Sequence, residues 1–221
     1  MKVLGVSGSP IKNSNTDRAV KALLDATGLE TEFVKLSDLT IEPCRACLGC
    51  VKTNICVIED DGTPLAQKAK DCDAIVIAGY TPYSTLDSRT KAFIERMYQL
   101  RHRNSLMAGK LGAAVMTSAV PHNAPGAPPV CDMGIQAITH YMHEEGITFV
   151  GAVKITGNVP CMKCGFGDTC KKSGVTMIYG PDATVDSVGI KTFEKQSLSF
   201  ESAEALGKEI ARRLTQSSVE G

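Results

Sequence analysis

The first sixteen residues, MKVLGVSGSPIKNSNT (Met1–Thr16), decide the fold of this chain. The segment Lys2–Val6 is short and apolar, it contains β-branched valines, and it ends at a cluster of Gly, Ser and Pro. This pattern predicts a strand that is buried on both faces, of the kind found in parallel sheets. A polar loop follows, and directly after it an amphipathic pattern predicts a helix over 16–27.

The loop between this strand and this helix is rich in groups that bind anions. A helix N-terminus offers unpaired N–H groups and the positive end of the helix dipole, and hydroxyl, amide and lysine side chains add donors. Neither GxGxxG nor GxxxxGK[ST] occurs in the chain, so a terminal monophosphate fits better than a pyrophosphate. An ordinary polar turn is the alternative. The candidate phosphate-binding residues are Ser7, Ser9, Pro10, Lys12, Ser14, Asn15 and Thr16.

The composition limits the class of protein. The chain has 221 residues, of which 43% are hydrophobic and 22% charged, enough for one globular domain over 1–221 with a sizeable core. The formal net charge is zero, which favours neither nucleic acid nor an anionic membrane as a partner. No apolar run approaches the ~18 residues of a membrane helix, and no signal peptide is recognisable. We therefore expect a cytoplasmic protein.

Apolar runs and amphipathic patterns alternate along the rest of the chain. Strands are predicted at 32–36, 74–79, 111–117 and 148–155, and helices at 63–72, 88–100, 133–145 and 202–214. This alternation predicts βαβ units on a five-stranded parallel sheet, which is a doubly wound α/β fold. The loops after the strands then share one edge, where ligands bind. Residues 156–199 are predicted to form an irregular insertion that carries cysteines.

Nine cysteines, an odd number, in a chain without an export signal do not suggest a disulfide framework. Seven of them fall into two compact groups, which indicates metal or cluster ligation. The first group, Cys44, Cys47, Cys50 and Cys56, has the spacing C-x2-C-x2-C-x5-C. Cysteines two residues apart can present three sulfurs to one side of a curling backbone, where Gly49 permits a tight bend. The fourth completes the thiolates that a cubane cluster needs. Zinc or a degenerate thiol site is the alternative.

Three segments together resemble a known family. Gly8-Ser9-Pro10 followed by Asn15-Thr16 resembles the FMN phosphate loop of the flavodoxin-like NAD(P)H-dependent FMN reductases. With the first cysteine group after such a loop, the chain resembles the archaeal and bacterial iron–sulfur flavoproteins over about 1–155. Lys91–Arg96 (KAFIER) is similar to that family's KAFIDR helix. The resemblance implies the strand order 2-1-3-4-5, one FMN, and one [4Fe–4S] cluster with the first cysteine group as its ligands.

The resemblance also implies a function. It implies an FMN-dependent oxidoreductase that passes electrons between the cluster and a two-electron acceptor through FMN. The donor would be ferredoxin or NAD(P)H, the acceptor a small molecule, and the working unit a homodimer or homotetramer with cluster and flavin close across subunits. Two alternatives stay open. One is an NAD(P)H-dependent FMN or quinone reductase with structural or zinc-binding cysteines, and the other is a non-catalytic redox or metal sensor.

The second cysteine group, Cys161, Cys164 and Cys170, repeats part of the first spacing within 156–199. In the order 2-1-3-4-5, four interstrand steps of about 4.8 Å separate the two groups by roughly 19 Å, so they cannot share one small cluster. Cys131 follows the fourth strand at the edge where ligands bind. We therefore predict a second site from these four cysteines, holding zinc or a cluster. A disulfide or a local redox pair is the alternative.

The loops after the third and fourth strands flank the place expected for the flavin ring. The candidate contacts are Thr81, Pro82, Tyr83, Ser84, Thr117 and Ser118. Tyr80 or Tyr83 can stack on the isoalloxazine, although a tyrosine at a strand end also has ordinary structural roles. The Pro-rich stretch 121–129 is a candidate lid or a rigid connection. No Ser/His/Asp set or carboxylate pair stands out, so hydrolysis is not supported.

Overall fold

One five-stranded parallel sheet forms the centre of the molecule. The structure is a computed structural model that describes residues 1–122, 126 and 128–217. Its strands are β1 (Lys2–Ser7), β2 (Glu30–Lys35), β3 (Ala74–Tyr80), β4 (Leu111–Ser118) and β5 (Thr148–Thr156). All neighbours pair in parallel in the order β2-β1-β3-β4-β5, which confirms the predicted doubly wound arrangement.

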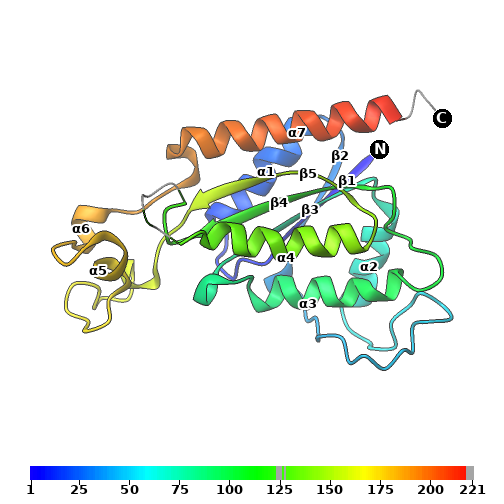
Figure 1. Ribbon diagram of the computed structural model, residues 1–221, viewed down its shortest axis with the longest axis horizontal. Coiled ribbons are helices and arrows are strands. Elements are labelled where there is room, and N and C mark those ends of the chain that lie inside the picture. Colours follow the sequence, from blue (N-terminus) through cyan, green and yellow to red (C-terminus); the bar gives the residue numbers. More distant parts are fainter. Residues whose placement is uncertain (123–125, 127, 218–221) are drawn as a thin grey trace.

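Helices cover both faces of the sheet (Figure 1). The long helices are α1 (Asn15–Thr27), α2 (Gly62–Asp71), α3 (Ser88–Arg96), α4 (Val130–Glu144) and α7 (Ser197–Ser217). Both faces need cover because the central strands are apolar on both sides: every residue of β3 from Ala74 to Gly79 is buried. Val20 of α1 and Ile210 of α7 are fully buried on one face of the sheet. Phe93 of α3 and Ile138 of α4 are fully buried on the other.

Short helical turns fill several connections. They are η1 (Leu36–Asp38), η2 (Pro82–Ser84), η3 (Met97–Leu100), η4 (Pro160–Met162), α5 (Gly174–Tyr179), α6 (Val185–Val188) and η5 (Phe193–Lys195). The segment 156–199, predicted to be irregular, therefore contains four such turns and the start of α7. Ser173 and Thr184 cap α5 and α6 with their hydroxyl groups. Capped turns this short carry no hydrophobic period, which is why the sequence pattern did not reveal them.

The carboxyl ends of the strands share one edge, on the left in Figure 1. The segment with α5 and α6 projects beyond this edge. The loop 39–61, which carries the first cysteine group, lies toward the other end of the molecule, below α3 (Figure 1). Among the helices of the described residues, none combines the length and the apolar character that crossing a membrane requires.

Candidate flavin site and cysteine groups

A buried ion pair between Asp17 and Lys35 supports the loop that follows β1. Asp17 is 1% exposed and accepts hydrogen bonds from Ser7 Oγ at 2.6 Å and from the backbone N–H of Ser14 at 3.0 Å. Lys35 Nζ lies 2.7 Å from Asp17 Oδ2 and donates to the carbonyl of Ser9 at 2.8 Å. The loop is therefore shaped before any ligand binds.

The start of α1 offers backbone donors to an anion. Ser14 caps the helix by accepting the N–H of Asp17 at 3.1 Å. The N–H groups of Asn15 and Thr16 have no earlier helical carbonyl to bind, and no acceptor in the described part of the chain occupies them. Asn13 has a φ of 52°, so the backbone turns sharply just before the cap. These features suit a phosphate at the helix N-terminus.

Three of the predicted phosphate ligands already bind other parts of the protein. Ser7 donates to Asp17, as described above, and Thr16 Oγ1 lies 2.8 Å from Thr117 Oγ1. The Asn15 amide donates to the carbonyl of Lys191 at 3.0 Å and accepts the N–H of Phe193 at 3.2 Å. Their side chains shape the site. Pro10 and Lys12 are exposed at the loop tip, and the binding role of the set stays a prediction.

Gly8 is needed because the start of α3 packs directly beneath it. A Cβ at this position would lie 2.0 Å from Thr90 Oγ1 and 2.7 Å from Asp87 Oδ1. Asp87 is 1% exposed, caps α3 by accepting the N–H of Thr90 at 2.9 Å, and accepts the N–H of Tyr80 at 3.2 Å. The N-terminus of α3 therefore lies directly under the phosphate loop.

The loop after β3 presents an aromatic ring on a left-handed backbone. Tyr83 is fully exposed with a φ of 51°, and Ser84 follows with a φ of 64°. Such a backbone costs about 1 kcal/mol per non-glycine residue. Thr81 donates its N–H to the carbonyl of Thr117 at 3.1 Å, and its hydroxyl is buried without a partner among the described residues. Burial raises the pKa of the Tyr80 hydroxyl. An exposed ring beside an unpartnered hydroxyl fits a flat polar-edged ligand.

The loops after β1, β3 and β4 thus come together, as the rule for parallel sheets predicts. Thr117 contacts both Thr16 and Thr81, and Ser118 accepts the N–H of Val120 at 3.0 Å. The Pro-rich stretch 121–129 lies partly outside the described residues, so its role as a lid stays a prediction.

The first cysteine group lies on an exposed loop. Cys44 and Cys47 are exposed, and Cys50 and Cys56 are half-buried. Burial raises the pKa of the Cys50 thiol, and negative charge on the other three thiols raises it further. Cys50 is therefore close enough to the other three cysteines for their charge to affect it. No three His, Cys, Asp or Glu side chains of the described residues converge tightly enough to hold a metal ion.

The backbone of this loop curls between the cysteines. Ala46 and Leu48 have φ values of 51° and 58°, and the N–H of Ala46 donates to Cys44 Sγ at 3.4 Å. The sequence predicted that Gly49 would supply the bend. Gly49 lies in a tight turn, which the N–H of Val51 closes by donating to the carbonyl of Leu48 at 3.2 Å. Its missing side chain also makes room for Val57, because a Cβ there would lie 2.8 Å from Val57 Cγ1.

Buried polar side chains attach the loop to the end of α3. Asn54 is 6% exposed and donates to the carbonyls of Gln99 at 2.8 Å and His102 at 2.9 Å. Gln99 Oε1 accepts the N–H of Cys56 at 2.8 Å. These contacts fix the cysteine loop on η3 and the turn that follows it.

Arg96 is the buried cation of this region. Its side chain is 1% exposed, lies 2.6 Å from Asp60 Oδ2, and donates to the carbonyl of Glu42 at 3.0 Å. It thereby joins the segments that enter and leave the cysteine loop. Burial disfavours its charge, but Asp60 and the Cys56 thiol in its charged form raise the pKa of the guanidinium above its ordinary value. Arg96 Nε is buried without a partner among the described residues. A donor left open beside a thiol fits a thiolate ligand at Cys56.

The first group lies at the far end of α3 and not at the edge where the strands end, so the estimate of roughly 19 Å between the two cysteine groups, which assumed one shared edge, stays untested. Asp87, at the start of α3, lies under the phosphate loop, whereas Gln99 binds the cysteine loop. Twelve helical rises between these two positions correspond to about 18 Å. The loop 39–61 is long enough to reach the far end of α3, and its buried anchors hold it there.

The second cysteine group lies in the segment beyond that edge. Cys161 is half-buried, whereas Cys164 and Cys170 are exposed. Cys161 Sγ accepts the N–H of Gly174 at 3.3 Å, and Cys164 Sγ accepts the N–H of Phe166 at 3.4 Å. Cys164 Sγ also donates to the carbonyl of Cys161 at 3.5 Å, so these two cysteines share one turn.

Cys131 is buried, whereas Cys164 and Cys170 are exposed, so the structure does not bring the predicted four-cysteine site together. Cys131 is 1% exposed in the first turn of α4, and its thiol points toward the carbonyl of Met116 in β4 at 3.7 Å. Burial raises its pKa to about 11. The residue follows β4 as predicted, but the helix turns this position into the core.

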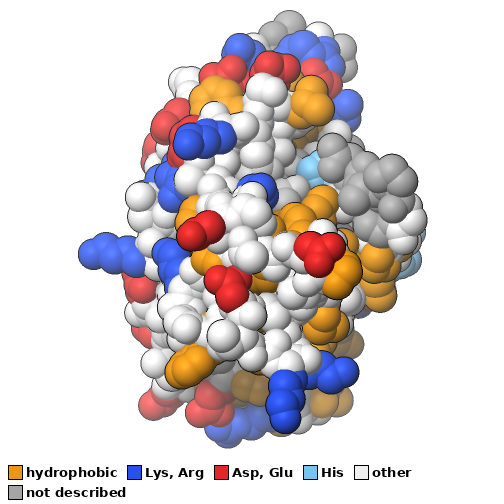
Figure 2. All heavy atoms as spheres, turned by 90° about the vertical axis from the view of Figure 1, so that its left-hand side faces the viewer, with side chains coloured by type: hydrophobic (Ala, Val, Ile, Leu, Met, Phe, Trp, Pro, Cys, Tyr) orange, Lys and Arg blue, Asp and Glu red, His pale blue; other side chains and the backbone are white. Residues whose placement is uncertain are grey.

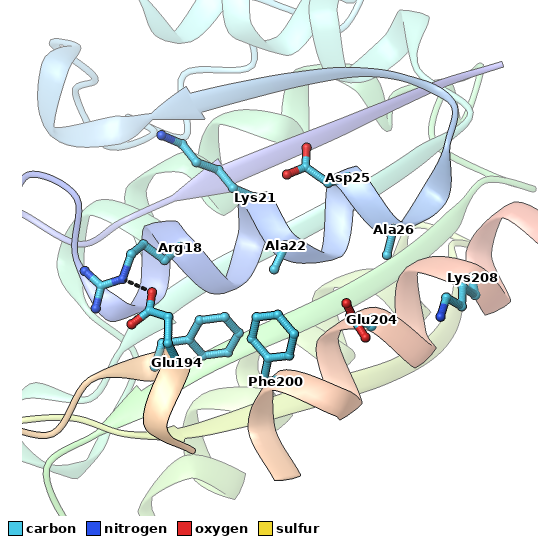
Figure 3. Close-up of a pocket in the computed structure, with 10 residues that line it drawn as sticks. Arg18, Lys21, Ala22, Asp25, Ala26, Glu194, Phe200, Glu204 and Lys208 are labelled. Atoms are coloured by element: carbon cyan, nitrogen blue, oxygen red, sulfur yellow. Dashed lines mark hydrogen bonds and ion pairs between the residues drawn. The ribbon is translucent and has the colours of Figure 1, made fainter. Parts of the chain in front are cut away.

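A groove of about 500 Å³ runs between α1 and α7, away from the strand ends (Figure 3). Arg18 of α1 and Glu194 of η5 form an ion pair across one end of it. Phe200 stands beside them, and both apolar and charged side chains line the rest. None of the predicted site residues lines this groove. The ion pair adds a second link between α1 and the end of the insertion.

Comparison with known proteins agrees with this geometry. The NADPH-dependent FMN reductase family matches residues 1–127, which include the phosphate loop and the first cysteine group. The chain belongs to this family. It is 31% identical over 154 residues to the "Iron-sulfur flavoprotein" of Methanosarcina thermophila, covering 68% of this chain and 78% of that protein. A second iron-sulfur flavoprotein, from Methanocaldococcus jannaschii, is 34% identical over 122 residues, which are 54% of this chain and 63% of the relative.

Solved structures of low identity support the fold. The Trp repressor binding protein from Bacillus subtilis superposes with a TM-score of 0.57 at 16% identity, covering 92% of this chain and 99% of that one. RosB with a bound flavin intermediate gives a TM-score of 0.63 at 14% identity, with 98% and 81% covered. A flavodoxin from the domain Archaea gives 0.50 at 15% identity, with 97% and 99% covered. The fold is flavodoxin-like, and this FMN reductase family member is an FMN-binding oxidoreductase.

Sequence reasoning missed the residues that support both sites. Asp17 and Lys35 hold the phosphate loop, and Asn54, Arg96 and Gln99 hold the cysteine loop. A helical aspartate or arginine has many surface roles, so the type of residue alone gave no signal. The resemblance of Lys91–Arg96 to the family helix marked Arg96, although no role was assigned to it.

Proposed function

We propose that the protein passes electrons between a [4Fe–4S] cluster on the first cysteine group and a small-molecule two-electron acceptor, through FMN. The relatives named iron-sulfur flavoproteins support this proposal. The observation that carries it is local: four cysteines lie on one curled loop whose backbone is fixed to Gln99 at Cys56, near the buried Arg96. Cys44, Cys47, Cys50 and Cys56 would be the ligands.

At the other end of α3, the chain's own groups would position FMN. The N–H groups of Asn15 and Thr16, with Ser9 and Lys12, would hold the phosphate. Thr81, Tyr83 and Ser118 are the nearest candidates for the ring. FMN, when bound, supplies the exchange between one-electron and two-electron chemistry. The ion pair of Lys35 and Asp17 fixes the conformation of the phosphate loop, and Asp87 packs beneath that loop.

The separation of the two sites supports an oligomer. About 18 Å of helix lies between the anchor of the cysteine loop and the phosphate loop within one chain. A homodimer or homotetramer would let the cluster of one subunit approach the FMN of another. Ferredoxin is the proposed donor, with NAD(P)H as the other candidate. The cytoplasmic location expected from the sequence stays a prediction.

Replacing Cys47 with Ala tests the cluster assignment. We expect anaerobically purified Cys47→Ala protein to lose iron and sulfide and to retain FMN, because the two sites share no side chain. Cys164→Ala is the matched control, since it removes another exposed cysteine outside the first group and should leave iron and sulfide unchanged. A Cys47→Ala protein with full iron and sulfide would refute the ligand assignment.

A second candidate function follows from the family itself. An NAD(P)H-dependent FMN or quinone reductase would need no cluster, and the family match covers that activity by description. In that case NAD(P)H should bleach the flavin of Cys47→Ala protein as fast as that of the wild type. If reduced ferredoxin reduces the wild-type flavin and NAD(P)H does not, the electron-transfer proposal is favoured.

A further inference from the structure

The segment 158–192, all of which is described, has too small a core to hold its own shape. Its helices α5 and α6 have six and four residues. Its buried apolar side chains are Met162 and Val175. Units with so little buried apolar surface are usually fixed by disulfides or by a metal ion. The segment contains three cysteines, and all three are free thiols.

Hydrogen bonds join the two ends of this segment beside the phosphate loop. Asn158 accepts the N–H of Lys191 at 2.8 Å and donates to its carbonyl at 2.8 Å. The same carbonyl accepts a hydrogen bond from Asn15 at 3.0 Å. Gly157 donates its N–H to the carbonyl of Ser118 at 2.7 Å. These hydrogen bonds therefore couple the folded conformation of this segment to residues that shape the FMN site.

The local geometry of the cysteines resembles that of a metal-binding turn. Cys161 and Cys164 have the C-x2-C spacing common among zinc sites. Gly165 follows with a φ of 81°, and the next N–H, from Phe166, donates to Cys164 Sγ. Gly174 donates to Cys161 Sγ from the start of α5. Both sulfurs thus receive a backbone donor, and Cys164 Sγ also lies 3.5 Å from the Cys161 carbonyl oxygen, so the turn brings the two cysteines together.

Cys170 is close to this turn along the chain and through its backbone. Its N–H donates to the carbonyl of Phe166 at 2.9 Å. Gly167 packs against Cys161, since a Cβ there would lie 2.6 Å from the Cys161 carbonyl oxygen. The three sulfurs do not converge in the structure. Cys164 and Cys170 are exposed, so core packing does not fix their rotamers. Figure 2 shows the molecule from the side on which this segment projects, with acidic side chains scattered among uncharged ones near the centre.

We propose that Cys161, Cys164 and Cys170 bind a single divalent ion of the zinc class. A cubane cluster needs about four thiolates, and the burial of Cys131 removes the fourth. A disulfide would use two of the three thiols and leave one unpaired. Three thiolates suit one tetrahedral ion whose last position takes water. The ion would fix 158–192 and, through Lys191, hold Asn15 at the phosphate loop.

Metal analysis of the complete protein tests this site. We expect wild-type protein supplied with zinc to bind one zinc in addition to its cluster iron. A Cys161→Ser/Cys164→Ser variant should lose that zinc and retain its iron and sulfide. Cys131→Ala and Cys47→Ala are the controls and should both keep the zinc. The two sites can thus be tested separately. Cys47→Ala tests the cluster, and the Cys161→Ser/Cys164→Ser variant tests the zinc site.

A second measurement uses wild-type protein, so it does not depend on the folding of a variant. Removing zinc with a chelator should make 158–192 sensitive to protease and raise the dissociation constant of FMN by about fivefold. Adding zinc back should reverse both effects, and Co²⁺ in its place should give thiolate-to-metal charge-transfer absorption. The proposal is overturned if the double variant keeps the zinc, if the wild type contains a Cys161–Cys164 disulfide, or if extra iron and sulfide occupy the group.

Discussion

A guanidinium that is 1% exposed needs partners on every side, and Arg96 has them on all but one. Asp60 neutralises its charge, the Glu42 carbonyl accepts one N–H, and the nearby Cys56 raises its pKa further when charged, while Nε has no partner among the described residues. The side chain of Asp60 is itself only 6% exposed. The energy of such a pair appears mainly when one partner is removed, because the other is then left as an unpaired buried charge.

Replacing Arg96 with Met should therefore destabilise the protein by about 3–5 kcal/mol, since Asp60 stays buried without its partner. Urea unfolding, followed by circular dichroism, measures the change. The double variant Arg96→Met/Asp60→Leu removes both charges and should recover most of the loss. A single variant within about 0.5 kcal/mol of the wild type would contradict this account.

Glu145 gives a pH-dependent prediction. It is 5% exposed beneath the loop that precedes β5, and burial raises its pKa even though Arg101 lies 3.7 Å away. The folded protein therefore binds this proton more tightly than the unfolded chain does. As the pH rises past the unfolded value of about 4.3, the folded state loses stability through this group.

Glu145→Gln removes the titration. The variant should match the wild type in acid and become increasingly more stable than the wild type as the pH rises toward neutrality. Urea unfolding at a series of pH values measures the difference. Glu144→Gln is the matched control, because that neighbouring carboxylate is exposed and should show little dependence on pH. A difference that shrinks with rising pH would show that Glu145 is stabilised by its charge.

Among the elements, the loop between β1 and α1 depends most on a residue outside it. Lys35, at the end of β2, contacts Asp17 and the loop carbonyls of Ser9 and Ile11. Its side chain is 10% exposed and that of Asp17 is 2% exposed. The edge strand thus fixes the shape of a loop that belongs to its neighbour in the sheet.

Lys35→Met should weaken FMN binding by about tenfold or more, because the loop loses its support and Asp17 is left unpaired. Fluorescence titration of the metal-replete apoprotein with FMN measures the affinity. Lys21→Met is the matched control, since that lysine is exposed on α1 and its ammonium lies over the Phe33 ring. Equal affinities for the two variants would remove Lys35 from the site.

The elements themselves were predictable to a large extent. Ala74–Gly79 and Leu111–Met116 contain no polar side chain, a pattern typical of a strand that is covered on both faces. The capped turns around Ser173 and Thr184 were not predictable, because their stability comes from single hydroxyl groups. The position of Cys131 was predicted along the chain but not around the helix, since a boundary shift of three residues in α4 decides which way the thiol points.

At the level of the whole molecule, the two sites lie at opposite ends of α3. The sequence places both after strands and therefore suggests one shared edge. The length of the loop 39–61 and its anchors at Asn54 and Gln99 decide otherwise, and side-chain hydrogen bonds between distant segments leave no period in a sequence. Only the fold shows that one chain holds its two sites apart.

Mixed oligomers test whether a second copy joins the two sites. Cys47→Ala chains should carry FMN without a cluster. Gly8→Ala chains should carry a cluster without FMN, because the added methyl group would collide with Thr90. Neither variant alone should show flavin reduction by reduced ferredoxin, whereas co-expressed chains should recover part of it. Stopped-flow absorbance at the flavin band measures the rate, and no recovery in verified mixed oligomers would place the transfer within one chain.

The attachment of the cysteine loop at the outer end of α3 affects how the protein responds to oxidative damage. Its cysteines contribute nothing to the two hydrophobic layers that pack on the sheet. Air that destroys an iron centre there should bleach the brown colour and leave a yellow, fully folded protein. The protein would thus lose its iron before it unfolds. Iron restored under reducing conditions should bind again, because the cysteine loop is still folded.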